Sequence, residues 1–541
     1  MKSDKARIFI VWLILAGTAS LLRFKTAIQT DALFLDALAS DLLTHHGVWT
    51  EWKFARAPSF FPDMLLYLAA YFVLPDAPAR IFWVSAIQVL LLGWTIVWTA
   101  RQLAPGLSRR AQSWLLLLLA LVTLTAARSN MWLYFYSTNN HIAAVILGLL
   151  GLVLYQRYLV QGGRLLALQL LLLGTLASLS TGLFTLSFTV PALLLCGLAW
   201  LLLRLQGSER LARRRLLLMG ALLAAAEVLA GALGKVLLPN RPIEGEVEAN
   251  PDTAANALKL FMRATKAAFA ADNRLTQALA VLLLLAFAYL GWRLLRQVKL
   301  DAKGLRIDFG AAADWRLGAS AAFLLLLLPI NLLGVILSGA FVDPACYRYF
   351  VFPLTLGLML AVILLECGGP RLRWTLEGLA LLLALFLLAS TVRVNRHPPV
   401  RTDLAQTVAD CLAAAEQQGV PLKAGVADYW NSRAVSHYLP RHNPILATWN
   451  TLQPFFWVST IGPVRRPQAY PEYQYNFAIL NNPGHNDQFT YTPDTLGKLL
   501  PPPSRIHACP AAKVQLWLYD GNELDAAMRQ ILLNYRRQPP P

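Results

Sequence analysis

Residues 24–67 read FKTAIQTDALFLDALASDLLTHHGVWTEWKFARAPSFFPDMLLY, a polar stretch that follows the first apolar segment of the chain. It contains two adjacent histidines, several aromatic residues and five acids, which are Asp31, Asp36, Asp41, Glu51 and Asp63. Ionisable groups are costly inside a bilayer, so a chain retains them where they have a function or a partner. We therefore expect any chemistry of this chain in residues 24–67.

The composition around this stretch is that of a membrane protein. Of the 541 residues, 57% are apolar and 14% are charged, whereas soluble domains contain about 45–50% apolar and roughly 25% charged residues. A spanning helix needs about 20 mostly apolar residues, and the apolar segments predict a polytopic α-helical membrane protein with about eleven spans. The expected spans are about 8–23, 80–101, 112–127, 141–159, 165–181, 183–203, 216–238, 275–295, 317–340, 349–365 and 374–392.

The distribution of basic residues gives the expected topology. The net charge is +18, and Lys and Arg occur mainly in short runs between apolar segments, most densely in 204–215. Such runs mark cytoplasmic loops, so this charge indicates orientation and not nucleic acid binding. The N-terminus is expected in the cytoplasm, with 8–23 as an uncleaved first span, while loop 24–79 and the C-terminus are expected outside.

Two helices of the external loop are expected at the membrane surface. Segment 61–74 is too short for a crossing and is predicted to lie at the outer interface. Segment 31–44 has apolar residues at helical spacing. A third amphipathic pattern begins at Thr253, in the external loop before the span at 275–295.

After residue 395 the composition becomes that of a soluble domain. Strand and helix patterns alternate from 396 to 541, which predicts a small external α/β domain, while 1–395 forms the membrane domain with loop 24–79. Cys411 and Cys509 are the two cysteines of this α/β domain. They form either a disulfide, as an oxidising compartment allows, or two buried thiols.

Asp31, Asp36 and Asp63 are the candidate catalytic acids. Asp31 lies near the start of the predicted helix 31–44, where it is either an N-cap or a general base or metal ligand. For Asp36 and Asp41 the alternative is the solvated face of this helix. Glu227, within a predicted span, is either structural or in contact with a lipid substrate.

The external loop resembles the GT-C glycosyltransferases, and most of all the branch with the protein O-mannosyltransferases and the lipid A aminoarabinose transferases. The matching residues are Asp31 in TDALFLDALA, Gly47, Trp49, Pro62 in PSFFPDMLLYL, and Arg348 and Tyr349 in CYRYFVFP. The chain departs from this branch at two places. Asp31-Ala32 stands where the branch often has Asp-Glu, and Phe61-Pro62-Asp63 stands where it usually has Pro-Pro.

The resemblance implies a transferase that takes a sugar from a polyprenyl phosphate carrier on the non-cytoplasmic face, here of a bacterial inner membrane. His141 stands where such enzymes often place a second acid, so Asp31 and His141 are the candidate ligands of a divalent ion, Mg or Mn. The acceptor is a glycan, a lipid or a protein.

Basic residues on the expected outer side are candidates for holding the carrier phosphate, because Arg binds phosphate in a bidentate manner. Interfacial snorkelling is the alternative. The candidate substrate-binding residues are Arg348, Tyr349, Arg128, His141, Arg56 and Lys235.

Two other functions remain open from the sequence. The same basic residues suit a flippase for lipid-linked saccharides, although the internal repeats common in transporters are not evident. A non-catalytic subunit of envelope assembly is the third alternative.

Overall fold

The computed structural model describes residues 30–45, 47–55, 57–126, 142–205, 210–238, 250–269, 314–367, 404–419, 421–481 and 492–537. It also describes 298–301, 304–307 and single positions between 277 and 296 and at 374 and 378. The predicted span 8–23 and the predicted domain boundary at 395 lie outside the described residues, as do nearly all of 374–392 and much of 275–295.

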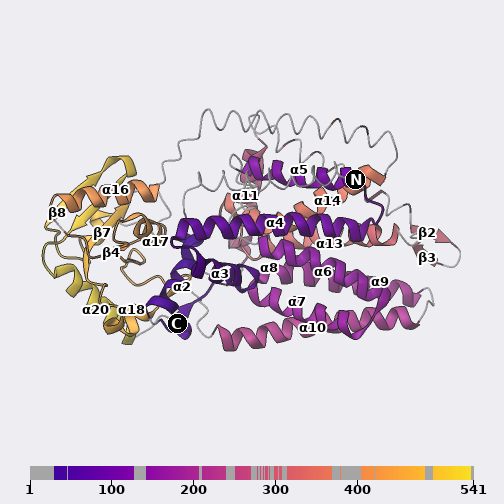
Figure 1. Ribbon diagram of the computed structural model, residues 1–541, viewed down its shortest axis with the longest axis horizontal. Helices are drawn as coiled ribbons and strands as arrows, with labels where there is room; N and C mark the ends of the chain where they lie inside the picture. Colours follow the sequence, from indigo (N-terminus) through magenta and orange to yellow (C-terminus); the bar gives the residue numbers. More distant parts are fainter. Residues whose placement is uncertain are drawn as a thin grey trace.

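Long apolar helices form the membrane part of the chain (Figure 1). Among the residues that the structure describes, six segments are long and apolar enough to cross a bilayer: 77–103, 142–161, 182–204, 211–237, 315–337 and 346–366. The helices are α4 (Ala77–Leu103), α5 (Arg109–Ala126), α6 (Ile142–Gln161), α7 (Arg164–Ser180), α8 (Gly182–Phe184), α9 (Val190–Leu205), α10 (Arg210–Leu237), α13 (Asp314–Leu337) and α14 (Val351–Cys367). The total of about eleven spans stays a prediction.

The two ends of the bundle differ in charge. At one end, Arg157 of α6 donates to the Gln102 side chain of α4 at 2.8 Å, and Arg316 of α13 donates to the Gln102 carbonyl at 3.0 Å. Arg215 of α10 donates there to the Leu159 carbonyl at 3.2 Å. Arg157, Arg215 and Arg316 therefore lie at one end of the bundle, and the assignment of this end to the cytoplasm stays a prediction.

The other end carries the described part of the loop 24–79 and the α/β domain. Ser59 donates its backbone N–H to the carbonyl of Ser180, at the end of α7, at 3.0 Å. Trp49 donates to the carbonyl of Leu237, at the end of α10, at 2.6 Å. Figure 1 shows the α/β domain at this end, next to α2 and α3, and the hairpin of β2 (Val298–Asp301) and β3 (Gly304–Ile307) at the opposite end.

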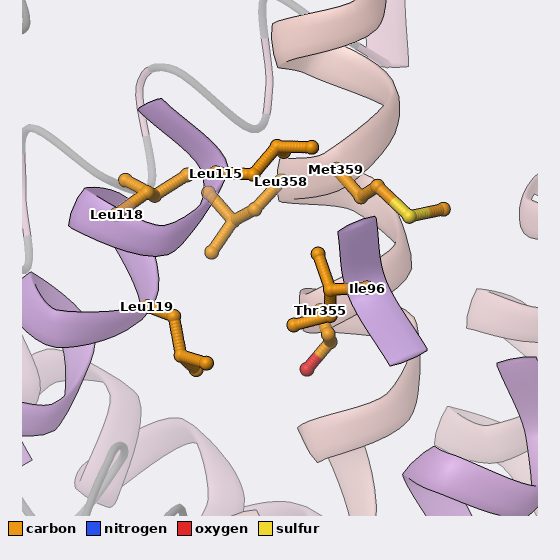
Figure 2. Close-up of a pocket in the computed structure, with 7 residues that line it drawn as sticks. All are labelled: Ile96, Leu115, Leu118, Leu119, Thr355, Leu358 and Met359. Atoms are coloured by element: carbon orange, nitrogen blue, oxygen red, sulfur yellow. The ribbon is translucent and has the colours of Figure 1, made fainter. Parts of the chain in front are cut away.

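The interior of the bundle is tightly packed. A pocket between α4, α5 and α14 has a volume of about 20 Å³ and is lined by Ile96, Leu115, Leu118, Leu119, Thr355, Leu358 and Met359 (Figure 2). The Thr355 hydroxyl donates to the Val351 carbonyl at 2.7 Å. This volume admits at most about one water molecule, which would need polar partners to stay there. The pocket is therefore a packing gap and not a ligand site.

The α/β domain contains a five-stranded mixed sheet in the order β5-β4-β7-β9-β8. Strand β4 is parallel to β5 and β7, while β9 is antiparallel to β7 and β8. Separate apolar cores cover the two faces of the sheet, one beneath α16 and α17 and the other beneath α20. The elements are α16 (Leu404–Gln417), β4 (Ala424–Ala427), α17 (Tyr429–Tyr438), β5 (Ile445–Ala447), β6 (Ser459–Thr460), α18 (Gly462–Arg465), β7 (Tyr475–Asn481), α19 (Pro493–Leu496), β8 (Arg505–Cys509), β9 (Val514–Leu518) and α20 (Glu523–Arg537).

Cys411 of α16 and Cys509 at the end of β8 are joined by a disulfide, with the Cα atoms 6.2 Å apart. Of the two alternatives that the sequence left open for this pair, the structure has the disulfide. It ties the first helix of the domain to the edge strand of the sheet.

The external loop packs into the α/β domain as well as onto the bundle. Its elements are a 3₁₀ turn (Thr30–Leu33), α2 (Phe34–Thr44), a second 3₁₀ turn (Trp49–Glu51), β1 (Trp52–Lys53), a π turn (Phe60–Met64) and α3 (Leu65–Val73). Strand β1 pairs with β6 of the domain, and a shared core holds Phe34, Trp52, Tyr67, Tyr429 and Phe455. Burial of this shared apolar surface fixes the loop between bundle and domain.

Candidate active site

Asp31 is held against the α/β domain and not at a helix cap. Helix α2 begins at Phe34, and its N-cap residue, Leu33, provides no side-chain hydrogen bond, so the N-cap alternative for Asp31 is wrong for this helix. The half-buried Asp31 carboxylate instead accepts a hydrogen bond from the Tyr429 hydroxyl. Burial, and then the nearby Asp31 charge, raises the pKa of Tyr429, so that Tyr429 stays protonated and keeps donating.

The backbone beside Asp31 is fixed by the same helix of the domain. The Thr30 hydroxyl donates to the Trp430 carbonyl at 3.0 Å. Arg433, one turn further along α17, donates to the Thr30 carbonyl at 3.2 Å and to the Val458 carbonyl at 2.8 Å. Helix α17 therefore positions Asp31 in two ways: Tyr429 binds the Asp31 carboxylate, and Trp430 and Arg433 bind the neighbouring residue, Thr30.

Asp36 is part of an ion pair that connects α2 to α4. Its carboxylate accepts from Arg80 at 2.8 Å and from the Tyr67 hydroxyl at 3.0 Å. Arg80 is 8% exposed, donates also to the Leu74 and Pro75 carbonyls and lies over the Tyr71 ring. The solvated-face interpretation of Asp36 is therefore wrong, and we assign it no step in the chemistry because its charge is already neutralised by Arg80.

Asp63 is buried beneath the loop, with 1% of its surface exposed. Its carboxylate accepts a hydrogen bond from the Gln88 side chain of α4. Burial raises the pKa of Asp63 from 3.8 to about 7, and hydrogen bonds from Gln88 and Ser59 oppose this shift. Its predicted catalytic role stays a prediction.

Because Asp63 is buried, its ionisation should lower the stability of the folded chain in a pH-dependent way. Between about pH 4 and pH 7 the folded chain holds a proton that the unfolded chain has lost, so stability falls as the pH rises, and the cost is constant above about pH 7. Asp63→Asn keeps an acceptor for Gln88 without the charge. The variant should be more stable than the parent at pH 8, by at most about 4 kcal/mol, and this advantage should shrink as the pH falls to 5.

Thermal unfolding of the purified full chain at pH 5 and pH 8 measures this difference. Asp76→Asn is the matched control, because Asp76 is an exposed cap of α4 that accepts from the Ala79 amide at 2.6 Å. A loss of stability of Asp63→Asn at pH 8 would show that the folded chain needs the charged carboxylate.

A polar cavity of about 280 Å³ lies between the loop and the α/β domain. Its ionisable lining residues come from α2 and the residue after it, from α17, and from the segments before β5 and β7, and they include Asp41, His45, Arg433, His442 and Glu472. Aromatic side chains form much of the remaining wall, namely Trp52, Tyr429, Phe455, Trp457, Tyr470 and Tyr473. This volume is at the lower end for small-molecule sites.

Asp41 is the buried carboxylate of this cavity and is 6% exposed. It accepts from the Trp52 indole N–H at 2.6 Å and from the Tyr470 hydroxyl at 2.8 Å. The solvated-face interpretation of Asp41 is wrong, because β1 and the α/β domain cover this side of α2. A Cβ atom at Gly47 would lie 2.1 Å from an Asp41 carboxylate oxygen, so only glycine fits beside it.

Glu51 closes the loop onto the domain. Its buried carboxylate accepts from Arg466 through Nε, at 3.0 Å and 3.1 Å, and through Nη2 at 2.8 Å. A planar guanidinium matches a carboxylate in this bidentate manner. The pair holds β1 and β6 together at the wall of the cavity.

The predicted phosphate-binding residues are described only in part. Arg348 lies in the 3₁₀ turn Pro344–Phe350 between α13 and α14, and its guanidinium lies 5.3 Å from the centre of the Tyr349 ring. Lys235 is exposed in the last turn of α10. The three other candidates, Arg56, Arg128 and His141, lie outside the described residues.

Glu227 has polar partners within the bundle. It accepts from the Ser178 hydroxyl at 2.8 Å and from the Thr185 hydroxyl at 2.9 Å. These bonds join α10 to α7 and to the π turn Thr185–Thr189, and they support the structural interpretation of Glu227.

Among the residues that the structure describes, Asp31 is not part of a group of three potential metal ligands. In the part of the chain that the structure describes, the group of three potential ligands is Cys411, His507 and Cys509, and both sulfurs of this group are in the disulfide. A disulfide offers no thiolate to a metal. The predicted pair of Asp31 with His141 is not tested, and we derive no step through a metal.

Sequence reasoning did not find Tyr429, Arg433, Tyr470 or Glu472. They belong to the α/β domain, which the sequence placed outside the membrane without assigning side chains to a site. An excess of acids in the loop and of tyrosines and arginines in the domain was the available signal.

Comparisons with known proteins give a similarity in structure but none in sequence. No family model matches the chain, and no curated protein matches it in sequence. Among solved structures, the chain is similar to the Archaeoglobus fulgidus oligosaccharyltransferase, crystallised in complex with Zn and sulfate. The TM-score is 0.47 and the identity 12%, over 87% of this chain and 67% of that chain. A similarity of this size does not by itself assign a fold or an activity.

Proposed function

We propose that this chain is an integral membrane glycosyltransferase of the GT-C type. It would transfer a sugar from a polyprenyl phosphate carrier to an acceptor hydroxyl at the end of the bundle that carries the α/β domain. The observation that supports this most is the position of Asp31. A carboxylate from the loop next to the membrane is fixed by Tyr429, a residue that also lines the polar cavity.

The proposed reaction is a direct, inverting displacement. The acceptor oxygen attacks the anomeric carbon as the bond from this carbon to the carrier phosphate breaks, and the proton of the acceptor hydroxyl passes to Asp31. Tyr429 positions the carboxylate and stays protonated. Negative charge grows on the leaving phosphate, and a fixed cation such as Arg348 would stabilise it.

The cavity supplies a place for the acceptor. Carboxylate, imidazole and guanidinium groups beside aromatic walls suit a ligand rich in hydroxyls, because aromatic rings cover its apolar faces while polar groups bind its hydroxyls. We assign the cavity to the acceptor and not to the lipid carrier. The carrier has a long apolar chain, which belongs between the spans and in the bilayer.

The orientation is part of the proposal. The arginine-rich end of the bundle would face the cytoplasm, and the α/β domain would face the periplasm of a bacterial cell. The disulfide between Cys411 and Cys509 supports this side, since disulfides form and persist in oxidising compartments.

The test uses the purified full chain in lipid with radiolabelled polyprenyl phosphate sugars, and it scores both hydrolysis and transfer, with and without EDTA. We expect carrier-dependent release or transfer of sugar. Loss of activity with EDTA, restored by Mg²⁺ or Mn²⁺, would show a metal requirement. Tight binding of the carrier without turnover would overturn the enzyme proposal in favour of a flippase or an assembly subunit.

A further inference from the structure

Helix α11 (Pro251–Ala268) has a fixed rotation on the surface of the bundle. Ala257 is 1% exposed, and the Phe261 ring lies 5.3 Å from that of Phe341 and 5.9 Å from that of Phe350. The Thr265 hydroxyl also bonds to the Tyr347 hydroxyl at 2.7 Å. These contacts anchor one side of α11 on α13 and on the 3₁₀ turn Pro344–Phe350. The direction in which each of its other sides faces is therefore fixed as well.

An apolar stripe of α11 stays exposed beside the anchored side. Leu258, Met262 and the C-cap residue Phe269 are 44%, 54% and 36% exposed, while Leu260, also 36% exposed, lies on the far side of the helix. Their spacing of four and then seven residues places them on one side of the helix, and at about 100° per residue this side adjoins the anchored one. Three large apolar side chains in a row are a typical feature of a surface that another apolar phase covers.

A basic stripe follows the apolar one around the helix. Lys259, Arg263 and Lys266 are exposed and spaced by four and three residues, which places them on one face. The one acid of α11, Asp252, falls on this face in the first turn, one or more turns from the three cations. Around the axis the order is therefore anchored side, exposed apolar stripe, exposed basic stripe.

This order is typical of a helix in the plane of a membrane surface, where apolar residues enter the acyl region and basic residues contact headgroups. Helix α11 adjoins the turn between α13 and α14, at the end of the bundle opposite the arginine-rich turns. The positive-inside rule, which places Lys and Arg in cytoplasmic loops, does not explain cations at this end of the bundle. An anionic lipid surface explains both stripes together.

We propose that α11 is a docking surface for anionic phospholipid. Leu258, Met262 and Phe269 insert among acyl chains, while Lys259, Arg263 and Lys266 bind lipid phosphates. This site does not depend on the proposed transferase activity. It holds the turn that carries Arg348 at a constant depth relative to the membrane surface.

The test measures lipid preference of the full chain. The protein is reconstituted in nanodiscs of phosphatidylcholine with about 30% phosphatidylglycerol, which supplies the anionic headgroups. It is then extracted, and the retained lipids are counted by native mass spectrometry. The variant is K259Q/R263Q/K266Q. The matched control is K423Q/K498Q/K513Q, which removes three exposed lysines from the α/β domain.

We expect the parent and the control to retain phosphatidylglycerol in preference to phosphatidylcholine. Each basic residue near an anionic surface favours binding by about fivefold, so the α11 variant should lose roughly 100-fold in preference at low salt. Equal retention by the α11 variant and the parent would overturn the proposal. So would an equal loss in the control, or no preference in the parent.

A second measurement tests the apolar stripe. Met262→Cys is labelled with an environment-sensitive NBD dye and reconstituted in nanodiscs. Its fluorescence should peak at a shorter wavelength than that of the free dye in buffer, and brominated lipids should quench this fluorescence. The labelled background also carries Cys367→Ala, because the chain has a further cysteine at the end of α14, while Cys196 and Cys346 are buried in the bundle. An emission wavelength typical of the dye in water would overturn the lipid assignment. So would a shift to shorter wavelength that occurs only when another protein co-purifies with the chain.

Discussion

Asp31→Asn should lower kcat for sugar transfer by about 10²- to 10⁴-fold, the usual contribution of a general base. Asparagine has the size of aspartate, and its side-chain oxygen can still accept the hydrogen bond from Tyr429. The geometry of the loop is therefore retained while the proton acceptor is lost. KM for the carrier should change little, because the substitution acts on the chemical step.

Two further variants make this measurement specific. Tyr429→Phe keeps the carboxylate and removes the bond that positions it, so we expect a smaller loss, about tenfold, as an order of magnitude for a misplaced group. Asp76→Asn changes an exposed acid of the same loop and should transfer sugar at the parental rate. A folded Asp31→Asn protein with the parental rate would falsify the assignment of Asp31 as the base.

Local patterns were sufficient to predict much of the membrane part. The predicted spans at 80–101, 141–159 and 216–238 coincide with α4, α6 and α10. An apolar run of about 20 residues has few alternatives to a spanning helix, because the bilayer leaves its backbone groups no other partners. The segment 61–74 likewise proved to be a short apolar helix, Phe60–Val73.

The partners of the loop acids could not be predicted in this way. Arg80 is 44 residues from Asp36, whereas Arg466 is 415 residues from Glu51 and Tyr470 is 429 residues from Asp41. A helical pattern tells which side chains share a face, but not whether a distant segment covers that face. Asp41 is therefore buried by β1 and the α/β domain, and Asp36 is paired with Arg80 of α4.

The candidate site shows the same limit. The resemblance singled out Asp31 from its position after the first span, and the structure adds that α17 holds it through Tyr429 and Arg433. The cavity requires the loop and the domain together. Its existence depends on contacts between residues some 400 positions apart, which no periodicity of a single segment encodes.

Removal of the disulfide should destabilise the α/β domain strongly. Cys411 and Cys509 are separated by 98 residues, and in the chain-entropy view a loop of this length contributes about 4–5 kcal/mol, while measured losses are typically about 2–5 kcal/mol. Both residues pack in the core beneath α16. Cys411→Ala/Cys509→Ala, which leaves no free thiol in this core, should lower the unfolding temperature of the domain by about 10–20 °C.

Hydrogen exchange of β4 and β7 in the full chain, followed with temperature, reports this transition. Cys196→Ala/Cys346→Ala is the control, because both thiols are free and buried in the bundle. A reductant should reproduce the loss in the parent and have no effect on the Cys411→Ala/Cys509→Ala variant, and an unchanged transition in that variant would contradict the prediction. Because α17 belongs to this domain and holds Asp31, the same reductant should also lower sugar transfer, at the temperatures where the domain opens and not below them.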